Sequence, residues 1–352
     1  MVKIGGMSMD IYNCKYINEL EKININKKIM ENKTIAISGA SGLIGSYLID
    51  YLLIDLKFNV KIYALVRNVE KAYTRFSKWK NDSRLKIIKC DVNEKIDFDC
   101  DNLDYVFHFA SNTHPLAYST RPISTITTNV IGTYNLLNFS NEHNCKRFVF
   151  ASSVEVYGKA LNNNDIFDEE YCGYINSNTL RAGYCESKRV GESLCQAFIK
   201  EKNMDVIIPR LPRVFGPTML LDDSKASSQF IKNGINKEDI ILKSKGNQFF
   251  SYCYVEDVVS AILFLLENAN NGEAYNIAND SCNVTLRKFA ETIADYVGKK
   301  VIFDLPNEVE KQGFSTAVNA ILDSKKINNL GWKGKISFDE GIKRTIDILK
   351  ES

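Results

Sequence analysis

The feature that most constrains the fold is a regular alternation, from Thr34 onward, of short β-rich runs with helical stretches. The runs are TIAIS, VKIYALV, LKIIKC, DYVFHFA and RFVFASS. Apolar strands that alternate with helices are typical of a parallel sheet covered on both faces, with right-handed crossovers between the strands. The pattern therefore predicts an α/β chain with a doubly wound parallel sheet.

A length of 352 residues exceeds one minimal core and indicates a larger and a smaller lobe. Residues 1–32, rich in Lys, Asn and Ile, are predicted to be an N-terminal extension. Residues 33–210 hold the alternating pattern and form the larger lobe, and residues 211–352 form mainly the smaller one. The sequence has no repeat or low-complexity linker, so we expect the lobes to pack closely.

Composition excludes several classes of partner and site. A net charge of +2, from 45 basic and 43 acidic residues, favours neither nucleic acid nor an anionic membrane as a partner. The 9 cysteines are scattered without a C-x-x-C pair, and the 3 histidines lack metal-ligand spacing, which predicts reduced thiols and no metal site. No apolar stretch reaches membrane-spanning length and no signal peptide is evident, so we expect a cytoplasmic protein.

Three glycines follow the first predicted strand. In SGASGLIGSYL, Gly39, Gly42 and Gly45 stand where a strand gives way to a helix. Such glycines allow a tight turn, a close backbone approach to a pyrophosphate and contact between helix and strand. The helix N-terminus then adds amide donors and the positive end of its dipole. This context predicts dinucleotide binding, with Ser41, Leu43 and Ile44 in the same phosphate loop.

The ends of the next two strands bear on the choice of cofactor. An acid after the second strand would bind a free adenosine 2′-hydroxyl, but this strand ends Val66, Arg67, Asn68. A guanidinium suits a 2′-phosphate, so Arg67 favours NADP(H) over NAD(H), and the alternative is that Arg67 is a solvated strand-end residue. Asp91, after the third strand, is placed to accept from the adenine amino group or to form a turn.

A tyrosine and a lysine one helical turn apart are candidates for acid/base work. Lowering the pKa of a tyrosine from about 10 to about 7 requires roughly 4 kcal/mol of preferential stabilisation of the phenolate, which an adjacent ammonium can supply. The chain has two Y-x-x-x-K matches. Gly298 interrupts the pair Tyr296 and Lys300, whereas Tyr184 and Lys188 lie within a predicted helix, on one face.

The motifs together resemble those of the extended short-chain dehydrogenase/reductases, the nucleotide-sugar epimerase/dehydratase group. The resemblance extends from about Thr34 to Leu349 and rests on GASGLIG, HFAS at 108–111, Asn129 in TNVIGTYNLL, SSVEVYG, YCESK, and PRLPRVFGP at 209–217. It implies a Rossmann domain over 33–210 that binds NAD(P), a smaller C-terminal substrate lobe, and a homodimer that pairs the helices near 120–141 and 180–202.

By the same resemblance, Ser153 is the catalytic hydroxyl and Tyr184 is the acid/base. Lys188 binds the nicotinamide ribose and lowers the pKa of the tyrosine. The cofactor contacts then include the positions Asp91, Val92, Ala110, Asn129 and Leu211, besides the glycine loop and Arg67.

The reaction depends on further acids and bases. Related dehydratases have an acid and a glutamate after the serine, but here Val154 replaces the acid and only Glu155 remains. Glu155 is either a catalytic base or a structural carboxylate. The stretches ASNTHPLAYSTRPISTITTNVIGT and RAGYCESKRVGESLC resemble the UDP-glucuronate decarboxylase branch. Two departures concern diphosphate binding, because the family's arginine is Phe250 here and the family's asparagine is Arg213.

These observations leave several functions open. Because Arg67 favours NADPH, the leading hypothesis is reduction of a keto group on a nucleotide-linked, possibly CDP-linked, sugar or polyol precursor of a surface polysaccharide such as a capsule. The alternative is a redox-neutral epimerase, decarboxylase or 4,6-dehydratase with tightly bound NAD(P). A third reading is a cofactor-binding scaffold without chemistry. Substrate contacts are predicted at Thr113, Arg213, Ser228, Gln229 and Tyr252.

Overall fold

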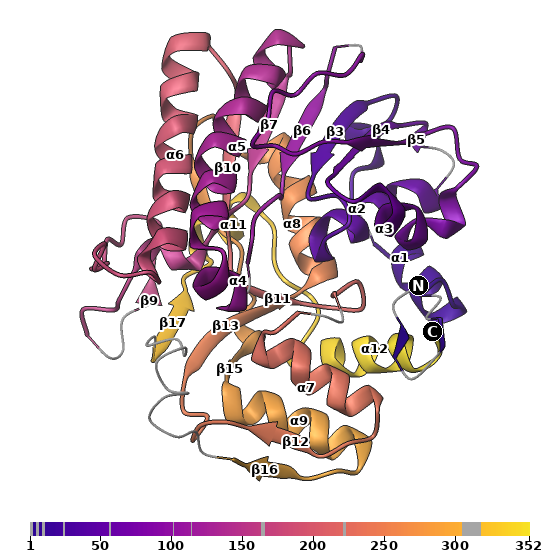
Figure 1. The fold of residues 1–352 in the computed structure, drawn as a ribbon, viewed down its shortest axis with the longest axis vertical. Helices are drawn as coiled ribbons and strands as arrows, with labels where there is room; N and C mark the ends of the chain where they lie inside the picture. The colour runs from indigo at the N-terminus through magenta and orange to yellow at the C-terminus, as the bar shows by residue number, and fades with distance from the viewer. Residues whose placement is uncertain are drawn as a thin grey trace.

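A parallel sheet between two layers of helices forms the upper part of the computed structural model, and a smaller group of strands and helices lies beneath it (Figure 1). The structure describes residues 3–4, 7–8, 11–23, 25–55, 58–100, 102–113, 115–162, 166–220, 223–304 and 318–352. Within these ranges, every helix is too short or too polar to cross a membrane.

The large sheet has the strand order β14-β10-β7-β6-β3-β4-β5, and all of these neighbours run parallel. Its strands are β3 (Thr34–Ser38), β4 (Lys61–Val66), β5 (Leu85–Lys89), β6 (Tyr105–His108), β7 (Arg147–Phe150), β10 (Val206–Leu211) and β14 (Ala274–Asn276). The chain proceeds outward from β3 to β5 and then returns to β6, on the other side of β3. This reversal confirms the predicted doubly wound sheet and opens a crevice at the carboxyl ends of β3 and β6.

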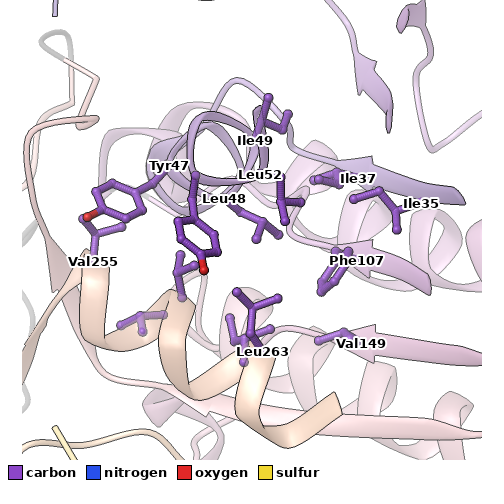
Figure 2. Close-up of a cluster of buried hydrophobic side chains, with 14 of the residues drawn as sticks. Ile35, Ile37, Tyr47, Leu48, Ile49, Leu52, Phe107, Val149, Val255 and Leu263 are labelled. Carbon is purple, nitrogen blue, oxygen red and sulfur yellow. The ribbon is translucent and has the colours of Figure 1, made fainter. Parts of the chain in front are cut away.

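Each face of the large sheet is buried by its own helices. On one face, α2 (Leu43–Ile54) and α8 (Val255–Asn268) pack on Ile35, Phe107 and Val149, and Figure 2 shows this cluster. On the other face, α5 (Pro122–Glu142) and α6 (Ala182–Lys202) cover apolar side chains of the same strands. Burial on both sides explains why these strands are almost continuously apolar.

The N-terminal extension packs on the larger lobe. It contains β1 (Lys3–Ile4), β2 (Met7–Ser8), α1 (Cys14–Glu21) and the 3-10 turn η1 (Lys27–Met30). Tyr16 of α1 donates to Asp50 of α2 at 2.7 Å. Glu19 accepts from Tyr47 of α2 at 2.8 Å and from Tyr254 at 2.7 Å. Two buried carboxylates therefore fix α1 in place.

The smaller lobe is built on a second sheet in the order β11-β13-β17-β9, with β15 antiparallel to β13, and on the pair β12 and β16. Its strands are β9 (Ile166–Phe167), β11 (Arg213–Phe215), β12 (Ile240–Leu242), β13 (Phe249–Tyr254), β15 (Asn283–Thr285), β16 (Val301–Phe303) and β17 (Asn319–Leu322). The helices α7 (Ala226–Ile235), α9 (Leu286–Val297) and α12 (Phe338–Lys350) share its apolar core.

The remaining elements are short helices, turns and one short strand. They are α3 (Val69–Arg75), α4 (Pro115–Thr120), β8 (Ser152–Ser153), α11 (Lys325–Leu330) and the short turns η3 (Ser77–Trp79), η4 (Val154–Tyr157) and η5 (Asp280–Cys282). Two strands cross the predicted division at residue 210, since β14 extends the large sheet and β9 pairs with β17. The two domains expected from the sequence, 33–210 and 211–352, therefore stay a prediction.

Candidate active site

The glycine series forms the turn from β3 into α2. Gly39 has φ +68°, a left-handed value that glycine adopts without strain, and a Cβ there would lie 2.7 Å from the Ala110 nitrogen. A Cβ on Gly45 would lie 2.6 Å from the Gly39 carbonyl oxygen. Any side chain at these two positions would displace backbone, so the turn requires glycine.

This turn fits the pyrophosphate of a dinucleotide. The helix begins at Leu43, directly after Gly42, and its first amides have no acceptor within the helix. They carry the positive end of the helix dipole. The structure thus gathers the predicted phosphate-loop positions Gly39, Ser41, Gly42, Leu43, Ile44 and Gly45, with Ala110 on the neighbouring loop.

The other predicted cofactor residues lie around the same sheet edge. Arg67 is exposed directly after β4. Asp91 is exposed and accepts from the Asn93 backbone at 3.0 Å, which is the turn role that the sequence left open. Val92 is buried next to Gly132 of α5, and Leu211 ends β10 opposite Ser153.

Asn129 links the sheet edge to the helix that carries the candidate acid/base. It is fully buried, accepts from the Ser111 hydroxyl at 2.7 Å and donates to the Ser187 hydroxyl at 2.9 Å. Ser187 is the neighbour of Lys188 on α6. The buried amide therefore holds α6 against the loop that follows β6.

Ser153, Tyr184 and Lys188 meet at the carboxyl end of the sheet. A hydrogen bond joins the Ser153 hydroxyl to the Tyr184 phenol. Lys188 is 3% exposed, and its ammonium donates to the Ala151 carbonyl at 2.7 Å. The rejected pair behaves as expected, because α9 ends at Val297 with Gly298 in the left-handed cap, between Tyr296 and Lys300. One of the two Y-x-x-x-K motifs thus reaches the sheet edge.

The charge balance at Tyr184 differs from the expected one. Burial raises the pKa of Tyr184 to about 12, and the hydrogen bond with Ser153 opposes this only in part. Burial also lowers the pKa of Lys188 to about 8. The expected lowering of the Tyr184 pKa by Lys188 is therefore wrong for this structure, because desolvation dominates and the ammonium is directed at the Ala151 carbonyl.

Glu155 lies between two arginines beside Tyr184. Its carboxylate is 3.0 Å from Arg181 Nη2 and 3.5 Å from Arg213 Nη2. The Cys185 thiol also donates to it, at 3.7 Å. In each arginine, Nη1 is buried and has no hydrogen-bond partner in the part of the chain that the structure describes. Two guanidinium groups thus retain donors for a further acceptor.

The substitution of Phe for the family's arginine at position 250 is explained by the register of β11 and β13. These strands run parallel with Arg213 opposite Tyr252. The guanidinium carbon of Arg213 lies 3.5 Å from the centre of the Phe250 ring. A cation from β11 therefore covers the position from which the family's arginine would extend, and it approaches Glu155.

The other predicted substrate residues are arranged at the junction of the lobes. Tyr252 is buried, which raises its pKa to about 12. Lys225 donates to the Thr113 hydroxyl at 3.3 Å and so connects the loop after β6 with the start of α7. On α7, Ser228 is buried and Gln229 donates to the Asp223 carbonyl at 2.5 Å. Thr113 and Gln229 therefore each form a hydrogen bond with a residue of segment 223–225.

Sequence analysis missed two site residues, Arg181 and Tyr118, and did not predict the protonation state of a third, His108. The Tyr118 ring lies 5.0 Å from the Tyr184 ring, and the Arg181 guanidinium lies 4.7 Å above Tyr118. A signal for Arg181 was its place three residues before Tyr184, whereas Tyr118 had none. His108, from the HFAS motif, is hydrogen-bonded to the Ser38 and Thr133 hydroxyls, and burial lowers its pKa to about 3. It is a neutral structural residue.

The described residues contain no group of three or more His, Cys, Asp or Glu side chains that could hold a metal ion. The side chains gathered at this edge supply hydroxyl, carboxylate, ammonium and guanidinium groups.

Comparison with known proteins decides the family. The model of the NAD dependent epimerase/dehydratase family matches residues 35–278. The chain belongs to this family. Among curated proteins it is 30% identical over 321 residues to UDP-glucuronic acid decarboxylase 5 of Arabidopsis thaliana, covering 90% of this chain and 89% of that protein. UDP-glucuronic acid decarboxylase 1 of Xenopus tropicalis is 30% identical over 91% of this chain and 73% of its own length.

Solved structures share the fold at lower identity. A dTDP-glucose 4,6-dehydratase from Streptomyces venezuelae, with NAD and TYD bound, superposes with a TM-score of 0.77 at 23% identity, covering 91% of this chain and 97% of that one. A UDP-glucose 4-epimerase from Thermotoga maritima, with UDP-glucose, gives a TM-score of 0.74 at 22% identity, covering 90% and 99%. The chain therefore belongs to a family of enzymes that includes nucleotide-sugar epimerases, dehydratases and decarboxylases.

Proposed function

We propose that this protein decarboxylates a nucleotide-linked uronic acid without net redox change. The observation that carries the proposal is the pair Arg181 and Arg213, whose buried Nη1 atoms lack acceptors among the described residues, beside Tyr184. Guanidinium groups bind carboxylates through such donors. The relatives named UDP-glucuronic acid decarboxylases support the same reading.

A bound nicotinamide dinucleotide would accept a hydride from the sugar carbinol and return it at the end of the turnover. The glycine turn and the N-terminus of α2 would hold its phosphates. Ser153 and Tyr184 would hydrogen-bond the sugar oxygen whose carbon is oxidised, and the hydroxyl proton released with the hydride would pass along these two hydroxyls to solvent and return when the ketone is reduced. A ketone next to the carbon that bears the carboxylate lets the carbon–carbon bond break with release of CO₂, and the electron pair moves to the ketone oxygen.

Tyr184 is suited to stabilise that oxygen. Its raised pKa, about 12, keeps the phenol protonated at neutral pH, so that it can donate to the developing enolate. Burial excludes water from this contact, which strengthens the hydrogen bond. The carbon that loses CO₂ must then gain a proton before the ketone is reduced again.

Arg181 and Arg213 would bind the sugar carboxylate, and Glu155 would relay a proton from solvent to the carbon that has lost CO₂. The carboxylate of Glu155 keeps both guanidinium groups turned toward Tyr184. Dehydration has less support, because the position after Ser153 is the buried aliphatic side chain Val154, which cannot donate a proton to a leaving hydroxyl. We assign Glu155 as the acid/base of the decarboxylation half.

For the cofactor we propose NAD(H), since the matching family is described as NAD dependent and the related Streptomyces venezuelae dehydratase has NAD bound. The preference for NADP(H), which was inferred from Arg67, stays a prediction. Arg67 is exposed directly after β4, a position that is compatible with either cofactor. Mass spectrometry of nucleotide released from the purified protein tests it. Arg67→Ala should leave the affinity for NAD⁺ unchanged, and a selective loss of affinity for NADP⁺ would restore the NADP(H) assignment.

We also propose a homodimer through α5 and α6. Ile123, Ile126, Ile131 and Tyr134 on α5 are between 41% and 78% exposed, and Val190 on α6 is 42% exposed. An apolar strip on two adjacent helices suits pairing with a second copy. Sedimentation of the wild type beside Ile126→Glu tests this assignment. A cytoplasmic location and a role in surface polysaccharide synthesis stay predictions.

The experiment for the function is incubation of the purified protein with UDP-glucuronic acid and NAD⁺. We expect a UDP-pentose and CO₂ in equal amounts, detected by mass spectrometry, while absorbance at the NADH wavelength returns to its starting value. Tyr184→Phe should abolish the product. Stoichiometric loss of NADPH with a keto sugar, and no reaction with UDP-glucuronic acid or related nucleotide-linked uronic acids, would favour the reductase instead.

A further inference from the structure

Glu192 lies one helical turn after Lys188 on α6. Its Oε1 accepts from the Ser152 hydroxyl at 2.5 Å and from Arg210 Nε at 3.0 Å. Its Oε2 accepts from Arg210 Nη2 at 2.8 Å. The side chains of Arg210 and Glu192 are only 14% and 15% exposed, so this is a well-buried bidentate pair.

The position of Ser152 gives this carboxylate a connection to the reaction. Ser152 stands between Ala151, whose carbonyl accepts from Lys188, and Ser153, which is hydrogen-bonded to Tyr184. In β8 the side chains of Ser152 and Ser153 point to opposite faces. A carboxylate that holds Ser152 on one face therefore fixes where Ser153 lies on the other.

Glu192 also supplies negative charge close to Lys188. Burial lowers the pKa of Lys188 to about 8, and Glu192 is the strongest influence that opposes burial, followed by Cys195 of the same helix. His108 of β6 also lies near Lys188, and it is neutral because burial lowers its pKa to about 3. The Phe150 ring of β7, 4.9 Å from the ammonium, adds a weaker attraction.

We propose that Glu192 is a positioning residue of the catalytic centre, holding Ser152 on α6 and keeping Lys188 in its ammonium form. Arg210 is the counterion that makes this burial possible, and it is itself fixed by the Glu169 carbonyl at 2.7 Å and the Tyr157 hydroxyl at 3.0 Å. The inference rests on the proposed function only through the roles given to Ser153, Tyr184 and Lys188.

The test measures Lys188 directly, without substrate. Side-chain ¹⁵N NMR of lysine-labelled protein follows the titration of the Lys188 ammonium, with the signal assigned through Lys188→Met. In Glu192→Gln we expect the titration midpoint to fall by about one pH unit, because a nearby opposite charge shifts a midpoint by about one to three units. Glu186→Gln is the matched control on the same helix, since the Glu186 side chain is 36% exposed and lies 4.0 Å from Arg189 in a surface ion pair.

A second variant separates charge from stability. Glu192→Gln leaves Arg210 buried without its partner and so should unfold more easily, whereas Glu192→Gln with Arg210→Met removes both charges and should recover stability. We expect the Lys188 midpoint to stay low in the double variant. Return of the midpoint to the wild-type value there, or no shift in folded Glu192→Gln, would overturn the proposal and leave Glu192 a structural residue.

Measurements of turnover form the last part of the test. The basic limb of the pH profile of kcat should move down with the Lys188 midpoint in Glu192→Gln, while KM for the nucleotide sugar stays unchanged. Ser152→Ala removes the hydrogen bond but not the charge, so it should lower kcat without moving the midpoint. If the wild type turns over no nucleotide-linked uronic acid, the proposed function fails, yet the NMR midpoints still decide the role of Glu192.

Discussion

Asp50 and Glu155 are both carboxylates that face arginine and tyrosine side chains, but their surroundings differ in one respect. Asp50 is 0% exposed and accepts from Tyr12, Tyr16, Trp79 and Arg75, so its oxygens are saturated. Glu155 is 23% exposed, and Arg181 and Arg213 each keep a buried Nη1 without a partner in the described residues.

The difference separates a structural carboxylate from a candidate functional one. At Asp50 four donors converge on the two carboxylate oxygens, so the carboxylate joins α1, α2 and α3, and the donor left without a partner among the described residues is Arg75 Nε. At Glu155 the donors exceed the acceptors that the described chain supplies. Buried polar groups without partners are uncommon in native proteins, and an acceptor brought by a substrate would satisfy them.

The largest effect that we predict from this comparison is on the free energy of unfolding. Asp50→Asn would leave the Arg75 guanidinium buried without its counterion, which costs about 3–5 kcal/mol of unfolding free energy. Urea unfolding measures this change. Glu291→Gln, which removes an exposed pair with Arg287, should cost less than about 1 kcal/mol. Equal unfolding midpoints for the two variants would refute the structural role of Asp50.

The second effect is on catalysis. Glu155→Gln should lower turnover about 10²- to 10⁴-fold, as expected for loss of an acid/base, while the unfolding midpoint changes little. Glu170→Gln, in the exposed segment before α6, is the control and should keep full turnover. If Glu155→Gln instead retains turnover and unfolds as readily as Asp50→Asn, then Glu155 is a structural carboxylate and the comparison fails.

The smallest effect concerns Glu256, which lies between the two extremes. Burial and the nearby Glu19 raise the pKa of Glu256 to about 7, although Arg344 donates to it at 2.8 Å. The folded chain then keeps this proton up to about pH 7, while the unfolded chain loses it near the ordinary value of 4.5. Stability from this group is complete below that ordinary value and is lost as pH rises through 7.

Comparison of Glu256→Gln with the wild type measures this loss. The amide cannot ionise, so its stability relative to the wild type should rise by at most about 1.4 kcal/mol per pH unit across this window. Urea unfolding at about pH 4.5 and about pH 7, the two ends of this window, gives the difference. Identical pH dependence in both proteins would show that Arg344 alone satisfies Glu256.

Much of the site could be predicted from local sequence patterns. The glycine turn, the parallel strand–helix alternation and the shared helix face of Tyr184 and Lys188 follow from spacing that is local in the chain. The contact between Arg213 and Glu155 could not, because it depends on the register that pairs β11 with β13. The Tyr184 pKa was predicted wrongly, since a motif conveys which residues are neighbours but not how deeply they are buried.

The shared acceptor Glu19 also constrains how the chain is made. Its two phenol partners differ greatly in distance along the chain, with Tyr47 28 positions later and Tyr254 235 positions later. During translation the N-terminal helix emerges first, yet its carboxylate remains incompletely paired until the β13 strand has left the ribosome. Final docking of the first segment synthesised is therefore among the last events of biogenesis, and a nascent chain halted before Tyr254 should carry α1 loosely attached.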